Sequence, residues 1–170
     1  MTKLIVKSNY NKNYERLKLI EEMEKEFNNK NIWFFSRLTF HEDPVIRTRA
    51  ICIIADLGGE LAVETISKAL KEDVDELVRH EAAFSLGQLG FTSAIKPLSE
   101  AVEKDPSIFV RHEAAVALGV IGSEDARSTL LSALNDPSEE VKKSAIVALS
   151  NLDYIYNYKK INKFTRMTGG

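Results

Sequence analysis

The sequence has almost no cysteine, and it also lacks a strong charge of either sign. Cys52 is the single cysteine among 170 residues, which excludes an internal disulfide framework or a cysteine-based metal cage and fits a reducing compartment. The formal net charge is −2, so no overall basic field favours binding to nucleic acid or to an anionic membrane. Apolar residues make up 44% and charged residues 28%, as is typical of a soluble globular protein.

Long hydrophobic runs are missing too. The first ten residues contain only the short apolar run Leu4–Val6, whereas a secretory signal needs about 7–15 apolar residues. No stretch approaches the roughly 18 apolar residues of a membrane span. We therefore expect one domain, located in the cytoplasm, without a membrane partner.

The chain does contain an internal repeat. The segment VRHEAAFSLGQLG at 78–90 returns as VRHEAAVALGVIG at 110–122, which is an offset of 32 residues. Related segments in the same register begin at Ile46 and Val141. Four copies in one register predict a stack of repeated units.

Each copy is predicted to form two helices. Turn residues separate the two helices in three copies, at 73–75, 105–106 and 136–137. Glycines stand where the second helix should end and suit left-handed caps, at 58–59, 90 and 122. We expect an all-α superhelix with four repeats over 41–153, capping helices over 1–40 and a basic, aromatic tail over 154–170.

The second helix of each copy has two different faces. Its apolar face, which should form the core, contains Val78, Ala82, Leu86 and Leu89. The opposite side holds His80, Phe84 and Gln88, with Glu81 and Gly87 next to them. The following copy places His112, Glu113 and Gly119 at the matching positions. The two His-Glu pairs should therefore point away from the core, on a surface that repeat proteins often use for binding.

These two pairs are candidate metal ligands. Neighbouring helix axes pack about 8–10 Å apart, so the imidazoles of His80 and His112 can reach one ion between them. Glu81 and Glu113 add carboxylate oxygens at the same level. Such ligands without a thiolate favour non-haem iron, with manganese or zinc as second choices. The zinc-protease spacing His-Glu-x-x-His is absent, because apolar residues occupy the position of its second histidine.

The outer copies lack the His-Glu pair. They carry Thr48 and Lys143 at the histidine position, and Arg49 and Ser144 at the glutamate position. The core positions are kept in all four copies, so packing does not require His-Glu. The alternative is that one repeat was duplicated with its surface residues attached.

Other residues on these helices have simpler interpretations. Gly87 and Gly119 either let a substrate approach the backbone or allow close helix packing. A basic column at the helix starts should form an ion-pair ladder with loop carboxylates such as Asp75 and Asp105. This column consists of Arg47, Arg79, Arg111 and Lys142. We interpret His41-Glu42 as a loop or cap pair and Cys52 as unreactive.

The segments 77–88 and 110–122 resemble the deoxyhypusine hydroxylase family. Its members are built from HEAT-like repeats, which are also seen in phycobilin-lyase-type proteins. The resemblance covers about residues 44–153. Members of the family have two four-repeat halves in one chain, which hold a di-iron centre between four His-Glu motifs. By this resemblance the chain corresponds to one half, and His80 and His112 would each bind iron. Glu81 would bind the iron held by the opposite half.

The resemblance also implies a reaction. Glu113 would be a catalytic residue and an additional candidate iron ligand, close to the substrate amine, and Gly87, Gly119 and Gln88 are candidate substrate contacts. The chain would be an O₂-dependent monooxygenase that hydroxylates a deoxyhypusine side chain on a translation factor. Half of the ligand set is missing, and a two-fold homodimer would restore it. The alternatives are a non-enzymatic adaptor that grips a protein, and a HEAT-like protein that binds a metal or a pigment.

The two ends of the chain leave more than one interpretation open. A charged amphipathic helix is predicted over 10–29, and aromatic residues follow over 32–40. These segments either cap the stack or contact a second copy, since aromatic residues are enriched at interfaces. The tail mixes tyrosines with lysines, a pattern that can bind single-stranded nucleic acid. The net charge favours instead a cap or a tail that docks on a partner.

Overall fold

The computed structural model describes residues 2–168, with side chains described for residues 13–158. Within this range the regular elements are helices, and no strand is present. The α-helices are α1 (Thr2–Asn28), α2 (Ile32–Leu38), α3 (Pro44–Gly58), α4 (Ala62–Glu72), α5 (Glu76–Leu89), α6 (Ile95–Lys104), α7 (Ile108–Ile121), α8 (Arg127–Ala133) and α9 (Glu139–Thr168). Three short 3₁₀ turns join them, η1 (Gly59–Leu61), η2 (Thr92–Ala94) and η3 (Glu124–Ala126).

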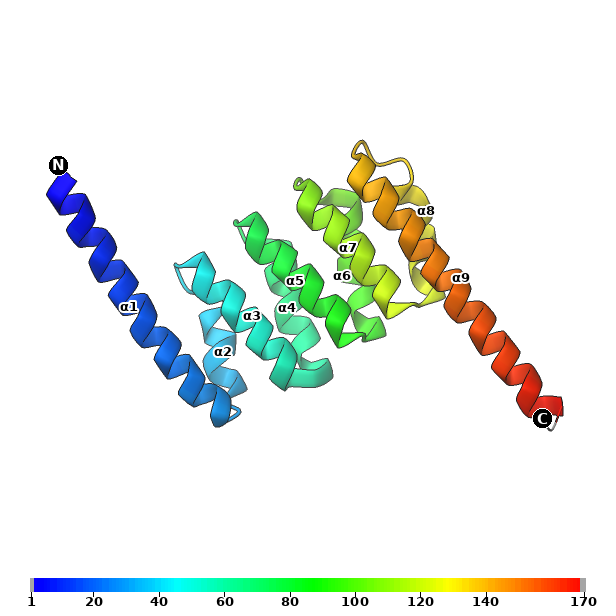
Figure 1. The fold of residues 1–170 in the computed structure, drawn as a ribbon, viewed down its shortest axis with the longest axis horizontal. Coiled ribbons are helices and arrows are strands. Elements are labelled where there is room, and N and C mark those ends of the chain that lie inside the picture. Colours follow the sequence, from blue (N-terminus) through cyan, green and yellow to red (C-terminus); the bar gives the residue numbers. More distant parts are fainter. Residues whose placement is uncertain (1, 169–170) are drawn as a thin grey trace.

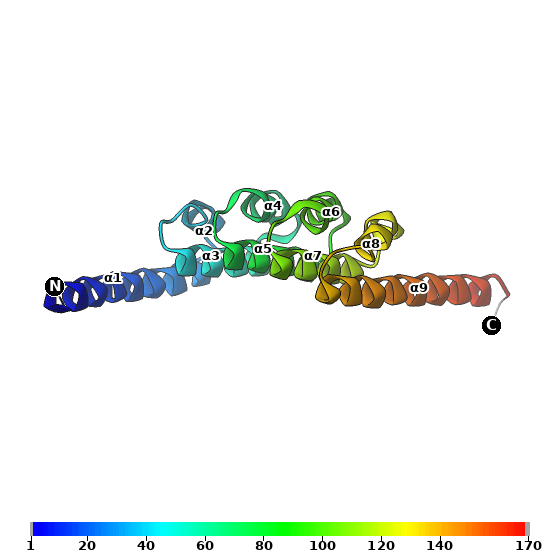
Figure 2. The same cartoon turned by 90° about the horizontal axis from the view of Figure 1, so that it is seen from above.

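The helices form two layers. Helices α1, α3, α5, α7 and α9 lie side by side in one layer, which we call the long-helix layer, and α2, α4, α6 and α8 cover it on one side (Figures 1 and 2). Successive helices alternate between the layers, so each copy contributes one helix to each. This arrangement confirms the predicted all-α superhelix.

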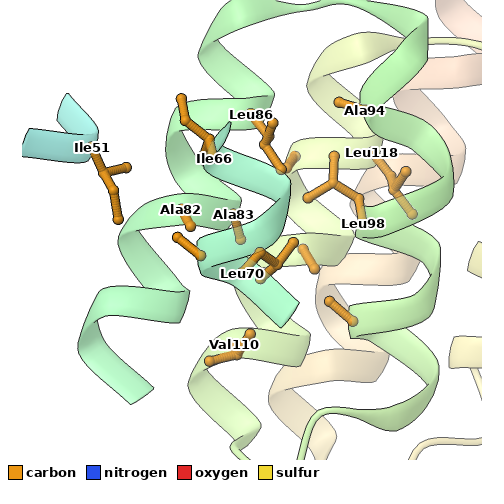
Figure 3. Packing of buried hydrophobic residues seen from close by; sticks show 14 of the residues in the cluster. Ile51, Ile66, Leu70, Ala82, Ala83, Leu86, Ala94, Leu98, Val110 and Leu118 are labelled. Carbon is orange, nitrogen blue, oxygen red and sulfur yellow. The ribbon is translucent and has the colours of Figure 1, made fainter. Parts of the chain in front are cut away.

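The core lies between the two layers. Val78, Ala82 and Leu86 of α5 are fully buried, as the helical wheel predicts. Ile66 and Leu70 of α4 pack with them, and Figure 3 shows these side chains in the cluster. Full burial of a side chain such as leucine or isoleucine stabilises the fold by roughly 1.5–3 kcal/mol. The apolar stripe therefore fixes which face of α5 remains outside.

Small residues bring the long helices close together. A Cβ atom added at Gly87 would lie 2.8 Å from the Cβ of Ala117, and one added at Gly119 would lie 2.7 Å from the Cβ of Ala148. Both glycines are buried. Close packing accounts for them, which is one of the two sequence interpretations, and a substrate contact at either glycine stays a prediction.

An arginine–aspartate ladder ties each copy to the next. Arg79 donates from Nε and Nη2 to the carboxylate of Asp105 at 2.7 and 2.9 Å, and from Nη1 to the carbonyl oxygen of Asp73 at 3.0 Å. The equivalent pairs are Arg47–Asp73 and Arg111–Asp136. The predicted ladder is confirmed for these three arginines. It holds neighbouring long helices in a fixed register.

Two predicted members of the ladder have other roles. Asp75 was expected to pair with an arginine, but its carboxylate accepts hydrogen bonds from the backbone N–H groups of Leu77 and Val78 and caps α5. Lys142 pairs with Glu139 of its own helix at 2.7 Å. The carboxylate two residues before the cap, Asp73, therefore accepts the arginine instead.

Helix α1 follows the register of the repeats, which the sequence analysis did not detect. Arg16 pairs with Asp43 at 2.7 Å, as the ladder arginines pair with their aspartates, and it lies 31 residues before Arg47. Met23 lies the same distance before Ile54 and is fully buried. Helix α1 is thus a further member of the long-helix layer, although it stands apart from α3 along much of its length (Figure 1). It also extends further towards the N-terminus than the predicted 10–29.

Helix α9 continues beyond the last repeat. The expected boundary between 153 and 154 lies inside this helix, which runs on to Thr168 and projects past the stack (Figure 1). Ile155 still faces Gly122 at the end of α7. The side chains of the basic residues over 159–170 lie outside the described residues. No helix in the described part of the chain is both long and apolar enough to cross a bilayer.

Candidate metal and substrate site

The two His-Glu pairs lie on the second turns of neighbouring long helices. His80 and Glu81 belong to α5, and His112 and Glu113 belong to α7. All four side chains are half-buried, on the side that the apolar stripe leaves outside. The structure thus places both pairs on one face of the long-helix layer.

The histidine of one copy faces the glutamate of the next. His80 Nε2 lies 3.4 Å from Glu113 Oε2. The side chain of Glu113 is 13% exposed and that of His80 is 35% exposed. A carboxylate with so little access to water needs a cationic or hydrogen-bonding partner. A protonated His80 would fill that role, and a ligand cation could replace it.

His112 is held by Ser144, which stands at the glutamate position of the fourth copy. Ser144 Oγ lies 2.7 Å from His112 Nδ1 and also donates to the carbonyl oxygen of Glu140 at 2.9 Å. A hydroxyl has one proton, so Nδ1 of a neutral imidazole must donate to Oγ. The lone pair of His112 then lies on Nε2. Proteins usually orient a metal-binding imidazole through such a hydrogen bond, donated by the ring nitrogen that does not bind the metal.

Glu81 is held from the other side by Cys52 of α3. The thiol Sγ lies 3.1 Å from Glu81 Oε1 and donates a hydrogen bond to it. Burial, together with this hydrogen bond and the charge of Glu81, raises the pKa of Cys52 to about 12. The thiol is therefore protonated at neutral pH, which supports its interpretation as unreactive. Sequence reasoning missed the contacts of Cys52 and Ser144, although the repeat register could have pointed to Ser144.

In the part of the chain that the structure describes, one copy does not assemble a complete metal site. Within the described residues, no three side chains of His, Cys, Asp or Glu come together in an arrangement that could hold a metal ion. His80 is paired with Glu113, while His112 is paired with Ser144. The donor types, imidazole and carboxylate, fit iron.

The remaining candidate residue lies further along α5. Gln88 is exposed two turns beyond His80 on the same side of the helix. Phe84 lies between them and is 44% exposed, so an apolar and a polar side chain flank the histidine. A role for Gln88 in substrate binding stays a prediction.

Comparison with known proteins defines the class first. Residues 29–118 and 63–150 match the family model for HEAT repeats, and the chain belongs to this family. Among solved structures, it is similar to human deoxyhypusine hydroxylase, determined in complex with glycerol. The identity is 30% and the TM-score is 0.68, over 74% of this chain and 44% of that one. The chain thus spans less than half the length of that enzyme. Comparison with curated protein sequences finds no match.

Proposed function

We propose that this chain is one half of an iron-dependent monooxygenase similar to deoxyhypusine hydroxylase. The carrying observation is the pair of His-Glu motifs on adjacent helices of one face, in a fold similar to that enzyme. The substrate would be deoxyhypusine or another lysine-derived side chain on a translation factor. The site of action would be the cytoplasm, where such a factor works.

A two-fold homodimer would complete the site. The chain covers 44% of the similar enzyme, and the described residues of one copy bring together fewer than three metal-binding side chains. An isologous interface presents the same surface twice. Two copies with their long-helix layers facing each other would bring four histidines and four glutamates to one cleft.

The residues of the site divide between metal binding and substrate binding. His80 and His112 would hold iron, with Glu81 as the ligand offered to the opposite copy. Bound iron supplies the activation of O₂ that attack on an unactivated C–H bond requires, since no amino-acid side chain provides this chemistry. Ser144 keeps Nε2 of His112 available as a ligand atom.

Glu113 would bind the substrate amine. It is the less exposed side chain of the His80–Glu113 pair, and in this structure its carboxylate faces the imidazole of His80. With the imidazole of His80 committed to a metal ion, the carboxylate would lack that partner and its negative charge would attract a cationic amine. Gln88 and the backbone at Gly87 and Gly119 would line the path of the substrate.

Metal analysis on the intact protein tests this function. After anaerobic reconstitution with Fe(II), we expect about one iron per chain, as two copies sharing a di-iron centre require. His80→Ala and His112→Ala should each lose this iron. Ser144→Ala should weaken iron binding by about 10–100-fold, because it removes the group that orients His112.

His41→Ala is the matched control. His41 lies in the loop before α3, where its Nδ1 accepts a hydrogen bond from the backbone of Asp43, and it is away from the site. This variant should retain the iron of the unmodified chain. Less than a tenth of an equivalent of iron in the unmodified chain, or equal loss in all three histidine variants, would contradict the proposal and leave a metal-free adaptor as the better description.

A further inference from the structure

An apolar groove opens between α1 and α3 on the face that carries the His-Glu pairs. Its volume is about 890 Å³, and Thr48, which occupies the histidine position of the first copy, lines it. Its apolar lining includes Met23, Phe27, Val45 and Leu77. The last three side chains are 40%, 47% and 66% exposed. A protein surface seldom leaves such a concave apolar area without a partner.

An exposed aromatic pair lies at the other end of the stack. The rings of Tyr154 and Tyr158 on α9 stack with their centroids 6.3 Å apart, and the side chains are 68% and 58% exposed. On a helical wheel these tyrosines and Val147 fall within about 60° of Lys143, the histidine position of the last copy. Val147 is 69% exposed. The aromatic pair therefore continues the face on which His80 and His112 lie.

The groove and the end of α9 carry opposite charges. Glu24, Asp56 and Asp75 line the groove, against the single base Arg49. The last turns of α1, residues 20–28, contain four glutamates and one lysine. The sequence over 154–168 contains four basic residues and no acidic one. Like charges would repel if two α9 ends met each other, whereas α9 and the groove are complementary.

We propose that two copies of the chain associate by placing the end of α9 of each copy into the α1–α3 groove of the other. The two-fold axis would pass between α5 and α7, and the rotation would reverse the order of the long helices in the partner. Helix α5 then lies against the partner's α7. The same rotation sets α9 against the partner's α3, next to the groove. Two identical contacts then close the dimer, with the four histidines between them.

This inference rests on the proposed function for the position of the axis, but the contact itself does not require iron. Its anchors are the exposed side chains of Val147, Tyr154 and Tyr158 against the apolar lining of the groove. Aromatic anchors seated in a pocket dominate the free energy of most interfaces. The charges around the groove select the partner and its orientation.

Sedimentation equilibrium on the metal-free full chain tests the anchors. The double variant Tyr154→Asp/Tyr158→Asp should raise the dimer dissociation constant by on the order of 30-fold or more. Tyr156→Asp is the matched control, because Tyr156 is 55% exposed but lies on the opposite side of α9. It should leave the dissociation constant nearly unchanged. A monomeric unmodified chain, or equal weakening by both changes, would overturn the inference.

Cross-linking in a Cys52→Ser background tests which surfaces meet. Chains with Val45→Cys, mixed with chains with Tyr158→Cys, should form a disulfide between the two kinds of chain. Chains with Tyr158→Cys alone should not cross-link to each other. Self-cross-linking would show contact between α9 ends, and long cross-linked oligomers of a chain with both changes would show a filament. Either result overturns the reciprocal dimer.

The two proposals fail separately. A dimer that depends on the tyrosines but takes up no iron would refute the proposed function and leave the groove contact standing. Iron binding that requires His80 and His112, in a dimer indifferent to the tyrosines, would refute the groove contact alone.

Discussion

Replacing Arg79 with methionine should destabilise the repeat stack more than the loss of a surface ion pair would. The guanidinium binds both carboxylate oxygens of Asp105 and also the carbonyl oxygens of Asp73 and Val74. The side chains of Arg79 and Asp105 are only 10% and 6% exposed. Methionine keeps much of the apolar stem but provides no donor for these four acceptors.

The magnitude follows from what is left behind. Removal of one partner from a buried ion pair costs about 3–5 kcal/mol, because the other charge stays buried without compensation. Asp105 keeps one hydrogen bond, from the backbone N–H of Ser107 at 2.8 Å. We therefore expect the lower end of this range, about 3 kcal/mol. For a chain of this size the melting temperature should fall by roughly 6–12 °C.

Thermal and urea unfolding followed by circular dichroism at 222 nm would measure the loss. Arg127→Met is the control, since Arg127 pairs with Glu124 and Asp153 at the surface, where the three side chains are 32%, 49% and 62% exposed. Its cost should be far smaller than that of Arg79→Met, because water and salt screen an exposed ion pair. Adding Asp105→Leu to Arg79→Met should recover much of the loss, because no buried charge then remains. Equal costs for the two arginines, or no recovery in the double variant, would refute the reasoning.

Two further predictions concern titratable groups. Burial raises the pKa of Asp136, but hydrogen bonds from Arg111 and from the backbone of Ser138 outweigh this, and the pKa is lowered from 3.8. Asp136 therefore stabilises the fold above pH 3.8, and its contribution is lost as the pH falls through the lowered pKa. Between pH 6 and pH 3, the urea midpoint of Arg111→Met should fall less than that of the unmodified chain. Identical changes of the midpoint in the two chains would contradict this. The raised pKa of Cys52, about 12, predicts alkylation by iodoacetamide at pH 8 that is ~100-fold or more slower than for a free thiol. Glu81→Gln should accelerate this reaction, and a native rate equal to that of a model thiol would show that the thiol is not held as described.

The repeat register made much of the fold predictable from the sequence. Because the four copies follow one another every 31 or 32 residues, a helical wheel for one copy gives the buried face of all, and Val78 and Leu86 are buried as expected. The same register predicts that the two His-Glu pairs share one face, as they do. It also predicts the arginine ladder, since equivalent positions in stacked helices face equivalent loops.

The errors arise where the repeat pattern weakens. Asp73 and Asp75 are both loop carboxylates, and the sequence alone does not show that Asp75 is used by the helix N-terminus. Helix α1 matches the register at Arg16 and Met23 but differs elsewhere, so the sequence alone does not show that it shares the repeat spacing. The repeat register marks Ser144 as the equivalent of Glu113, but it does not show that the serine hydroxyl reaches the imidazole of His112 on the neighbouring helix.

The ladder has a consequence for how chains of this kind change length. Each unit supplies an arginine that reaches into the following unit, and an aspartate that receives one from the preceding unit. Gain or loss of one whole unit by tandem duplication or deletion therefore leaves no interior carboxylate orphaned. Lys142, which turns to Glu139 of its own helix, terminates the series without requiring a further acceptor. Evolution can lengthen or shorten such a protein in steps of about one repeat without an unstable intermediate.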